Sequence, residues 1–470
     1  MADAPKFVLR ELALFERPVR LRMPFRFGVV TLTECPQAFA RARIELPDGS
    51  SHWGAAAELL APKWFDKNLA LSNEDNFDQL RAVLRLARDA YLADAAPASA
   101  FGHFARNFPA HMQAAAAQGF NPLLASYGPA LLDRAVLDAL CRAQGISFYT
   151  AITRNLAGIA FPPLEMGAFL GRLVPAATIE ARHTVGLLDA ITAGDPHAPV
   201  PDGLPVTLEE VVATYGHRYF KLKVNGQIAS DLARLEAIAA VLDQSPSPYF
   251  ASLDGNEQYQ DAQGVAELVA GIRARPALAR LWESILFIEQ PIARKLALDT
   301  DLRESPLGKP VIIDESDGEL DSFVQARARG YDGVSSKTCK GFYKSILNAA
   351  RCAAWNAQDG TARYFMSAED LTCQAGLSVQ QDLALAALLG LSHAERNGHH
   401  YASGFGHTPP AEPQAFKAAH PDLYRGNPPV LRFGPQAELQ IDSLYAPGFA
   451  HRADPDFSAM QPLADAPSLV

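Results

Sequence analysis

The chain is poor in cysteine. Its five cysteines are odd in number, widely scattered and never arranged as a CxxC pair. This pattern argues against a disulfide framework or a cysteine zinc site, and it is typical of reduced thiols in a cytosol. The sequence also lacks a long apolar run: the longest, residues 383–391, is about half a membrane span, and the N-terminus has no secretion-type apolar stretch. We therefore expect a cytoplasmic protein that does not enter a membrane.

An excess of basic residues is also missing. The 470 residues carry a net charge of -10, and the pI is about 5.7. Nucleic acids and anionic membranes are bound by basic faces, so we expect neither partner and favour a small-molecule substrate. With 49% hydrophobic residues, the chain can bury a large core and is long enough for two or three domains. We also expect a homo-oligomer.

Three regions of the chain differ in pattern. Residues 1–155 combine strand-like segments with amphipathic helical segments, which predicts an α+β domain. Residues 156–407 alternate short apolar segments with helical ones, which implies parallel strands joined by right-handed crossovers. We count residues 163–170 as the first of these strands. Residues 408–470 are rich in proline and contain one alternating segment, and we expect them to pack back on the first domain.

Charged residues end five of the predicted strands. In chain order they are a basic pair, three carboxylates and another base: Lys221 and Lys223, Asp254, Glu289, Asp314, and Lys337. Each strand is otherwise apolar and is followed by a helical pattern, as is typical of a strand buried on both faces. In a parallel barrel the carboxyl ends of the strands meet on the face where active sites are built. The positions of these charged residues therefore predict a single active site at one end of the barrel.

Lys221 and Lys223 are two residues apart on a predicted strand, so they point to the same side, about 6.5 Å apart along it. A KxK pair is common on a solvated edge strand. The apolar flanks here predict a buried strand instead, whose lysines must face carboxylates. We expect the second ammonium to lower the lysine pKa from about 10.4 toward a value useful for a base, and Lys223 to be functional.

Asp254, Glu289 and Asp314 are spaced 35 and 25 residues apart, close to one strand–helix unit each. A lone aspartate at a strand end is usually a helix N-cap, but three carboxylates in register are hard to explain that way. Without cysteine or histidine ligands beside them, they are typical of a hard-cation site, Mg²⁺ first. We prefer Asp314 over Glu315 as a ligand, because Glu315 should point to the opposite face. Asn256 is expected near the metal.

The motifs form a set that resembles the enolase superfamily, in its muconate lactonizing enzyme branch (the mandelate racemase/muconate lactonizing enzyme family). They are KxK at 221–223, DxN at 254–256, EQP at 289–291, DES at 314–316 and SSKxxK at 335–340. The match covers residues 219–345, and residues 131–145 and 445–454 also resemble segments of that family. The resemblance implies a modified TIM barrel, (β/α)7β, under an α+β capping domain built from both chain ends.

The same resemblance implies roles for individual residues. Asp254, Glu289 and Asp314 would bind Mg²⁺, with Mn²⁺ as a substitute, and Lys223 and Lys337 would be acid/base lysines assisted by Lys221. Among the departures from the family pattern, two bear on the reaction. The seventh-strand region, residues 363–371, has no histidine base of the mandelate racemase type, and the region after the eighth strand lacks the Asp-x-Asp pair of many dipeptide epimerases.

Barrel geometry supplies an expected reaction. Lys223 ends the second strand and Lys337 the sixth, on opposite sides of an eight-stranded ring. One lysine would remove the α-proton of a small carboxylate, such as an amino-acid derivative, and the other would protonate the enolate on the opposite face, giving racemisation or epimerisation. A lyase or cycloisomerase, for example an acid-sugar dehydratase, is the alternative. A barrel that binds a small molecule without converting it is a more remote alternative, because the sequence retains all the lysines and carboxylates of the predicted site.

The candidates for substrate contact are less specific. Phe25 and Phe27 lie in an expected capping loop and Trp64 in another, where aromatic residues contact substrate or simply pack in a lid. A second set lies in the barrel region. Glu369 and Asp370 could bind an amine or cap the next helix, His399 belongs to a pocket or to a solvated turn, and Lys340 supports Lys337 or lies on a helix surface.

Overall fold

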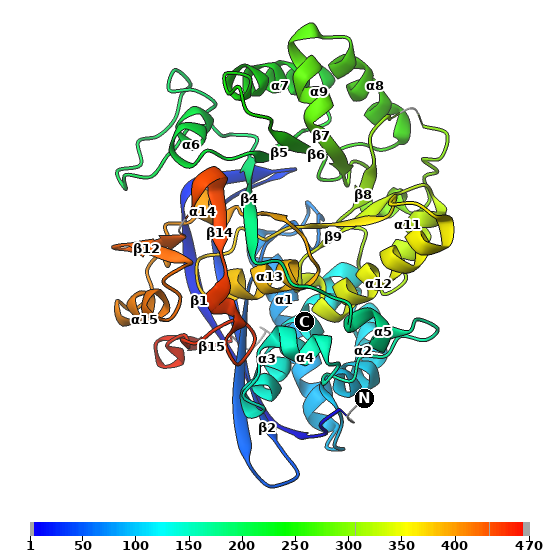
Figure 1. The fold of residues 1–470 in the computed structure, drawn as a ribbon, viewed down its shortest axis with the longest axis vertical. Helices are drawn as coiled ribbons and strands as arrows, with labels where there is room; N and C mark the ends of the chain where they lie inside the picture. Colours follow the sequence, from blue (N-terminus) through cyan, green and yellow to red (C-terminus); the bar gives the residue numbers. More distant parts are fainter. Residues whose placement is uncertain (1–3, 306, 432, 464–470) are drawn as a thin grey trace.

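The computed structural model describes residues 4–305, 307–431 and 433–463. Eight parallel strands form a closed barrel, since the last strand pairs with both the seventh and the first. They are β4 (Thr178–Val185), β5 (Tyr219–Lys223), β6 (Phe250–Asp254), β7 (Ile285–Glu289), β8 (Val311–Ile313), β9 (Gly333–Ser336), β10 (Phe365–Ala368) and β11 (His393–Glu395). In Figure 1, α7 to α9 lie at the top of the view and α2 to α4 in its lower half.

A helix follows each of the first seven strands. These are α6 (Leu208–Tyr215), α7 (Ile228–Leu242), α8 (Ala262–Arg273), α10 (Arg294–Ala297), α11 (Ser322–Ala328), α12 (Phe342–Asp359) and α13 (Leu377–Leu388). Shorter elements join them: η1 (Pro276–Leu278), α9 (Ala279–Ser284), η2 (Thr338–Lys340) and, after β11, α14 (Gly398–Tyr401). The predicted (β/α)7β order is confirmed.

The prediction for the first barrel strand is wrong. Residues 163–170 contain helix α5 (Met166–Leu170), and the first strand is β4 instead. Met166 and Leu170 are both buried and lie four residues apart, which is helical spacing that a short apolar run cannot distinguish from a strand. The strand β4 was hidden because its sequence, TIEARHTV, carries charged residues. The numbering of later strands is unaffected, so Lys223 still ends the second strand.

The first part of the chain forms an antiparallel sheet with helices packed on it. Its elements are β1 (Val8–Phe27), β2 (Val30–Glu45), β3 (Ser51–Leu59), α1 (Asn73–Ala93), α2 (Ala100–Ala117), α3 (Pro122–Ala143) and α4 (Phe148–Thr153). Helix α3 crosses β3 closely: a Cβ on Gly54 would lie 2.2 Å from the backbone nitrogen of Ala139. Ser72 begins α1 with a capping box, and Asn121 caps α3.

The C-terminal segment joins both parts of the molecule. Strand β14 (Glu438–Gln440) pairs with β4 of the barrel, and β15 (Gln461–Pro462) pairs with β1 of the cap. Between and around them lie α15 (Ala411–Ala419), β12 (Tyr424–Gly426), β13 (Pro429–Leu431), η3 (Pro435–Ala437), η4 (Asp442–Tyr445) and η5 (Phe457–Ala459).

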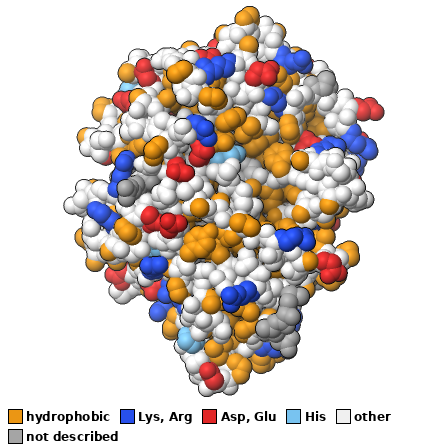
Figure 2. Space-filling view, in the orientation of Figure 1, with side chains coloured by type: hydrophobic (Ala, Val, Ile, Leu, Met, Phe, Trp, Pro, Cys, Tyr) orange, Lys and Arg blue, Asp and Glu red, His pale blue; other side chains and the backbone are white. Residues whose placement is uncertain are grey.

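The longest apolar stretch of the chain lies mostly in helix α13, every residue of which is buried. The helix contacts β3 of the cap and β4 and β11 of the barrel, so the stretch belongs to the core between the two parts. No helix within the described part of the chain is both long and apolar enough to cross a membrane. All five cysteines are buried free thiols. Figure 2 shows acidic and basic side chains interspersed on one face, with hydrophobic side chains gathered near its centre.

Candidate active site

Charged residues converge inside one end of the barrel. Strand register places Lys223 beside Asp254 and Asp254 beside Glu289, while Asp314 directly follows β8 and Lys337 directly follows β9. All five side chains are buried, and the most exposed, Lys223, retains 5% of its surface. The structure therefore brings together the residues that the strand ends indicated, at the carboxyl end of the barrel.

Lys221 lies at the centre of four carboxylates. Its Nζ is 2.8 Å from Glu289 Oε2 and 2.9 Å from Asp254 Oδ2. Glu369 Oε2 and Glu395 Oε2 lie 2.9 and 3.1 Å away. Burial alone would lower the pKa of Lys221, but these anions raise it well above its usual value. The expectation of a depressed lysine pKa is thus wrong for Lys221, because four carboxylates lie within 3.1 Å of its ammonium.

Lys223 and Lys337 each bind one carboxylate. Lys223 Nζ donates to Asp254 Oδ2 at 2.6 Å, and Lys337 Nζ donates to Asp314 Oδ2 at 2.6 Å. Burial opposes the charge of Lys337, but Asp314 outweighs it and raises the pKa of this lysine. Lys340 Nζ donates to the second oxygen of Asp314 at 3.1 Å and is 2% exposed, so it lies inside the site rather than on a helix surface.

The two lysines line one cavity with aromatic neighbours. Lys223 Nζ lies 5.9 Å from the centre of the Phe27 ring, and Lys337 Nζ lies 4.4 Å from the centre of the Trp64 ring. The other lining residues are Phe25, Leu32, Ala61, Asn256, Asp370, Leu371, Thr372, Glu395 and Asn397. The cavity is about 20 Å³, which is room for about one water molecule. Phe25 and Phe27 belong to the end of β1, so the expected capping loop is the tip of the β1–β2 hairpin.

The barrel holds the Trp64 segment through Arg294 and two ion pairs of Glu257. Arg294 Nη2 donates to the Trp64 carbonyl at 2.6 Å and to Glu257 Oε2 at 2.7 Å. Glu257 also lies 2.8 Å from Lys67 Nζ, on the same capping segment as Trp64. The buried carboxylate of Glu257 therefore fixes the cap against the barrel on the Lys337 side of the cavity.

Glu315 does not face away from the carboxylates, contrary to expectation. Its Oε1 accepts a hydrogen bond from Asn256 Nδ2 at 3.2 Å, and the Asn256 backbone nitrogen donates to Asp254 Oδ1 at 2.8 Å. Strand β8 ends at Ile313, so the alternation of strand side chains no longer applies at Glu315. Burial, followed by repulsion from Asp314, raises the pKa of Glu315 to about 7.

The residues present fit a hard divalent cation. Asn256 Oδ1 and Glu315 Oε2 are buried without a hydrogen-bond donor, and Glu289 Oε2 receives no aligned hydrogen bond although Lys221 is near. Buried oxygens without donors are costly, and an all-oxygen set with several carboxylates is the kind that Mg²⁺ prefers. In this structure lysine ammonium groups neutralise the carboxylates.

Glu369 and Asp370 do not cap the next helix, because α13 begins only at Leu377. Glu369 binds Arg182 and Lys221 inside the barrel and lies outside the cavity. Asp370 lines the cavity, but its Oδ2 lies 2.9 Å from Arg396 Nη2. Both acids therefore already have cationic partners.

His399 belongs neither to the cavity nor to a solvated turn. It lies in α14, 9% exposed, and its ring packs against other histidines outside the barrel.

Three contributors were missed in the sequence. Glu395 lines the cavity and binds Lys221, and the signal for it was available, since β11 ends in an acidic residue as β7 does. Arg182, which binds Glu369, lies on the strand that was misplaced. Asn397 lines the cavity from the segment after β11, and nothing in its local sequence marks it.

Comparison with known proteins bears on both halves of the molecule. Residues 204–420 match the family model described as enolase C-terminal domain-like. No curated protein is significantly similar to the chain.

Solved structures share the whole fold at low identity. An enolase superfamily member from Roseovarius nubinhibens ISM is 17% identical, with 98% of each chain covered and a TM-score of 0.59. A dipeptide epimerase from Enterococcus faecalis V583, complexed with Mg and the dipeptide L-Leu-L-Tyr, is 13% identical over 94% of this chain and 99% of that one, with a TM-score of 0.59. A muconate lactonizing enzyme from Mycobacterium smegmatis, complexed with muconolactone, is 15% identical over 97% and 100%, with a TM-score of 0.61.

Proposed function

We propose, from the match of residues 204–420 to the enolase C-terminal domain-like family model, that the chain is a Mg²⁺-dependent racemase or epimerase. The reaction is a 1,1-proton transfer at the α-carbon of a small carboxylate. The observation that carries the proposal is the placement of Lys223 and Lys337. They line one cavity from the second and sixth strands, which lie opposite each other in an eight-stranded ring.

Each lysine would serve one face of the bound α-carbon. Lys223 would remove the proton from one enantiomer while Lys337 protonates the other face, and the reverse reaction exchanges their roles. Asp254, Glu289 and Asp314 would hold the Mg²⁺. A bound Mg²⁺ supplies positive charge that stabilises the negative charge developing on the substrate as its α-proton leaves.

The cavity wall supports a substrate with an apolar group. Phe25, Phe27 and Trp64 surround the lysines, whereas the acidic groups near the cavity already bind Arg396 or Lys221. An apolar substituent gains from contact with these rings, and a substrate ammonium would have to compete for an occupied carboxylate. Because the cavity holds about one water, entry also requires the hairpin tip or the Trp64 segment to move.

The test is α-proton exchange in D₂O, followed by NMR for both enantiomers of each candidate substrate. N-acyl and N-methyl amino acids, dipeptides and acid sugars would be screened first, because exchange reports proton abstraction whatever the product. With a two-base site, Lys223→Ala should stop exchange from one enantiomer and retain it for the other. Lys337→Ala should give the mirror result, because abstraction needs only one base whereas inversion needs both.

Lys344→Ala is the matched control. Lys344 is also a buried lysine, but it contacts Asp317 and does not line the cavity, so both enantiomers should still exchange. Exchange of one enantiomer alone in the wild type, with an alkene product, would contradict the epimerase proposal.

That result would favour the second candidate, a lyase or cycloisomerase. A muconate lactonizing enzyme shares the fold, and elimination or cycloisomerisation can use the same pair of lysines with one of them as the base. In such an enzyme only one lysine substitution should stop exchange, and the substrate should be accepted in one configuration.

A further inference from the structure

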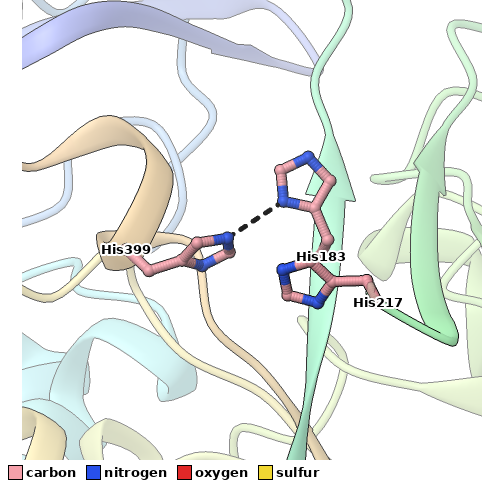
Figure 3. A group of neighbouring side chains, drawn as sticks. All are labelled: His183, His217 and His399. Carbon is pink, nitrogen blue, oxygen red and sulfur yellow. Dashed lines mark hydrogen bonds between the residues drawn. The ribbon is translucent and has the colours of Figure 1, made fainter. Parts of the chain in front are cut away.

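Three histidines gather outside the catalytic cavity. His183 lies on β4, His217 precedes β5, and His399 lies in α14 (Figure 3). His183 Nδ1 and His399 Nε2 are 3.1 Å apart, and the three rings each present a nitrogen within 4.8 Å of the other two. Figure 3 shows the His183 and His399 rings facing one another across this contact, with the His217 ring beside them. None of the three lines the cavity that holds Lys223.

Backbone carbonyls set the orientation of two rings. His217 Nδ1 lies 2.9 Å from the Ala181 oxygen, and His399 Nδ1 contacts the Arg396 oxygen. A ring nitrogen that faces a carbonyl carries the proton, so Nε2 of each ring holds a lone pair. Histidine ligands of metals are commonly oriented by this arrangement. His217 Nε2 is buried and has no hydrogen-bond partner, which leaves its lone pair directed into the cluster without a donor.

Aromatic rings and a fourth histidine, His400, surround the cluster; the His400 ring centre lies 4.8 Å from that of His183. The rings of Tyr215 and Phe433 pack against His217 and His399, with centroids 5.0 to 6.0 Å apart. His183, His217 and His399 are 1%, 5% and 9% exposed. Burial lowers the pKa of His217 to about 4, so its ring is neutral at neutral pH and its lone pair remains available.

We propose that His183, His217 and His399 bind a transition-metal dication of the Zn²⁺ class, at a site separate from the carboxylates. Imidazole suits Zn²⁺, Cu²⁺ and Ni²⁺, whereas Mg²⁺ prefers oxygen. Nitrogen ligands lie about 2.0–2.1 Å from tetrahedral Zn²⁺, so two of them are about 3.4 Å apart. The His183–His399 pair is already close to this spacing, and His217 would need to approach by up to about 1.4 Å.

The ion would join segments that are distant in the sequence. His183 lies on the strand that closes the barrel against β11, and His399 lies just after β11, so the site bridges this seam. His217 also lines a cavity of about 260 Å³ outside the catalytic site, but neither His183 nor His399 lines that cavity. Because the ion would bind the folded state and not the unfolded one, it would raise the free energy of unfolding of the closed barrel.

The experiment titrates metal-free protein with Zn²⁺ by calorimetry in saturating Mg²⁺, and repeats the titration with Co²⁺ as a spectroscopic probe. We expect one equivalent of Zn²⁺, visible Co²⁺ bands of a tetrahedral nitrogen site, and a rise in Tm on adding Zn²⁺. His217→Gln should weaken binding at least about tenfold. His111→Gln is the matched control, since His111 is a buried histidine of α2 outside the cluster, and it should bind as the wild type does.

Three outcomes would overturn the proposal: no Zn²⁺ bound in saturating Mg²⁺, unchanged binding by His217→Gln, or binding lost in Asp254→Asn but kept in His217→Gln. The last would place the ion at the carboxylates. If His217→Gln does not fold, as judged by circular dichroism, His399→Gln takes its place with the same expected loss.

Discussion

The network around Lys221 offers a direct test of how the barrel end is stabilised. Lys221→Met retains an unbranched side chain but removes the ammonium that contacts Asp254, Glu289, Glu369 and Glu395. All four acids are buried, so none of them can replace this partner with bulk water. We expect a less stable protein whose defect depends on pH.

Removing one partner of a buried ion pair costs about 3–5 kcal/mol, because the remaining charge is left without compensation. Arg182 still binds Glu369 and Lys223 still binds Asp254 in the variant. The loss of stability should therefore stay in this range and should not be four times as large, although four carboxylates lose a contact. The four buried carboxylates would then repel one another without the ammonium that separates them. Burial and Glu369 already raise the pKa of Glu289 well above its usual value in the wild type.

The sign of the pH dependence follows from these pKa shifts. In Lys221→Met the folded carboxylates should titrate above the unfolded value of about 4.3, so the folded state binds more protons than the unfolded state. The stability of the variant therefore falls as pH rises through the raised folded pKa. The difference from the wild type should be largest near neutral pH and shrink as pH approaches about 5.

Urea denaturation at about pH 7.5 and about pH 5.5 would measure both effects. Lys344→Met is the control, since this buried lysine contacts Asp317 alone among carboxylates and Lys340 still compensates that acid. Its loss should be smaller and nearly equal at the two pH values. A cost below about 1 kcal/mol for Lys221→Met, or a cost that grows as pH falls, would refute the reasoning.

Three further predictions concern the metal, the cap and the C-terminal segment. EDTA should abolish turnover and Mg²⁺ restore it, while Asp254→Asn should remain folded by circular dichroism but inactive; full turnover in EDTA would contradict the carboxylate site. Trp64→Leu should lower kcat/KM about tenfold, because its ring lies 4.4 Å from Lys337 Nζ, whereas unchanged kinetics would leave the ring a packing role only. Burial lowers the pKa of His451, but Asp138 outweighs burial and raises this pKa to about 9. The His451–Asp138 pair therefore stabilises the fold fully below about pH 6.5, and its contribution is lost as the pH rises to about 9. His451→Gln should remove this pH-dependent contribution, up to about 3 kcal/mol, and equal shifts of the urea midpoint at about pH 6 and about pH 9.5 would contradict it.

The local sequence predicted the positions of side chains correctly where the geometry of one strand, or of parallel strands that end together, decides them. Lys221 and Lys223 share a side because strand side chains alternate, and Asp254 and Glu289 meet because parallel strands end at the same rim. Glu395 obeys the same rule and could have been found by it. The rule failed for Glu315, because its strand ends two residues earlier.

Other features depend on which segments face one another across the fold. Asp254 and Glu289 contribute most to the raised pKa of Lys221, and Glu369 and Glu395 add to it from the ends of the seventh and eighth strands, which reach Lys221 only when the barrel closes. His183, His217 and His399 are separated by long stretches of chain and carry no shared motif. Their rings meet because β4 pairs with β11 and α14 follows immediately.

The sequence by itself determined the alternation of strands and helices and the charged strand ends, because hydrophobic periodicity and strand alternation act over a few residues. The (β/α)7β order was implied by the resemblance of its motifs to a known family. The tertiary structure alone decided where the ring closes, how the aromatic residues of the cap meet the lysines, and which charges compensate one another. Those outcomes depend on distances between residues far apart in the chain. Burial and Coulomb energies vary steeply with such distances, and no local pattern encodes them.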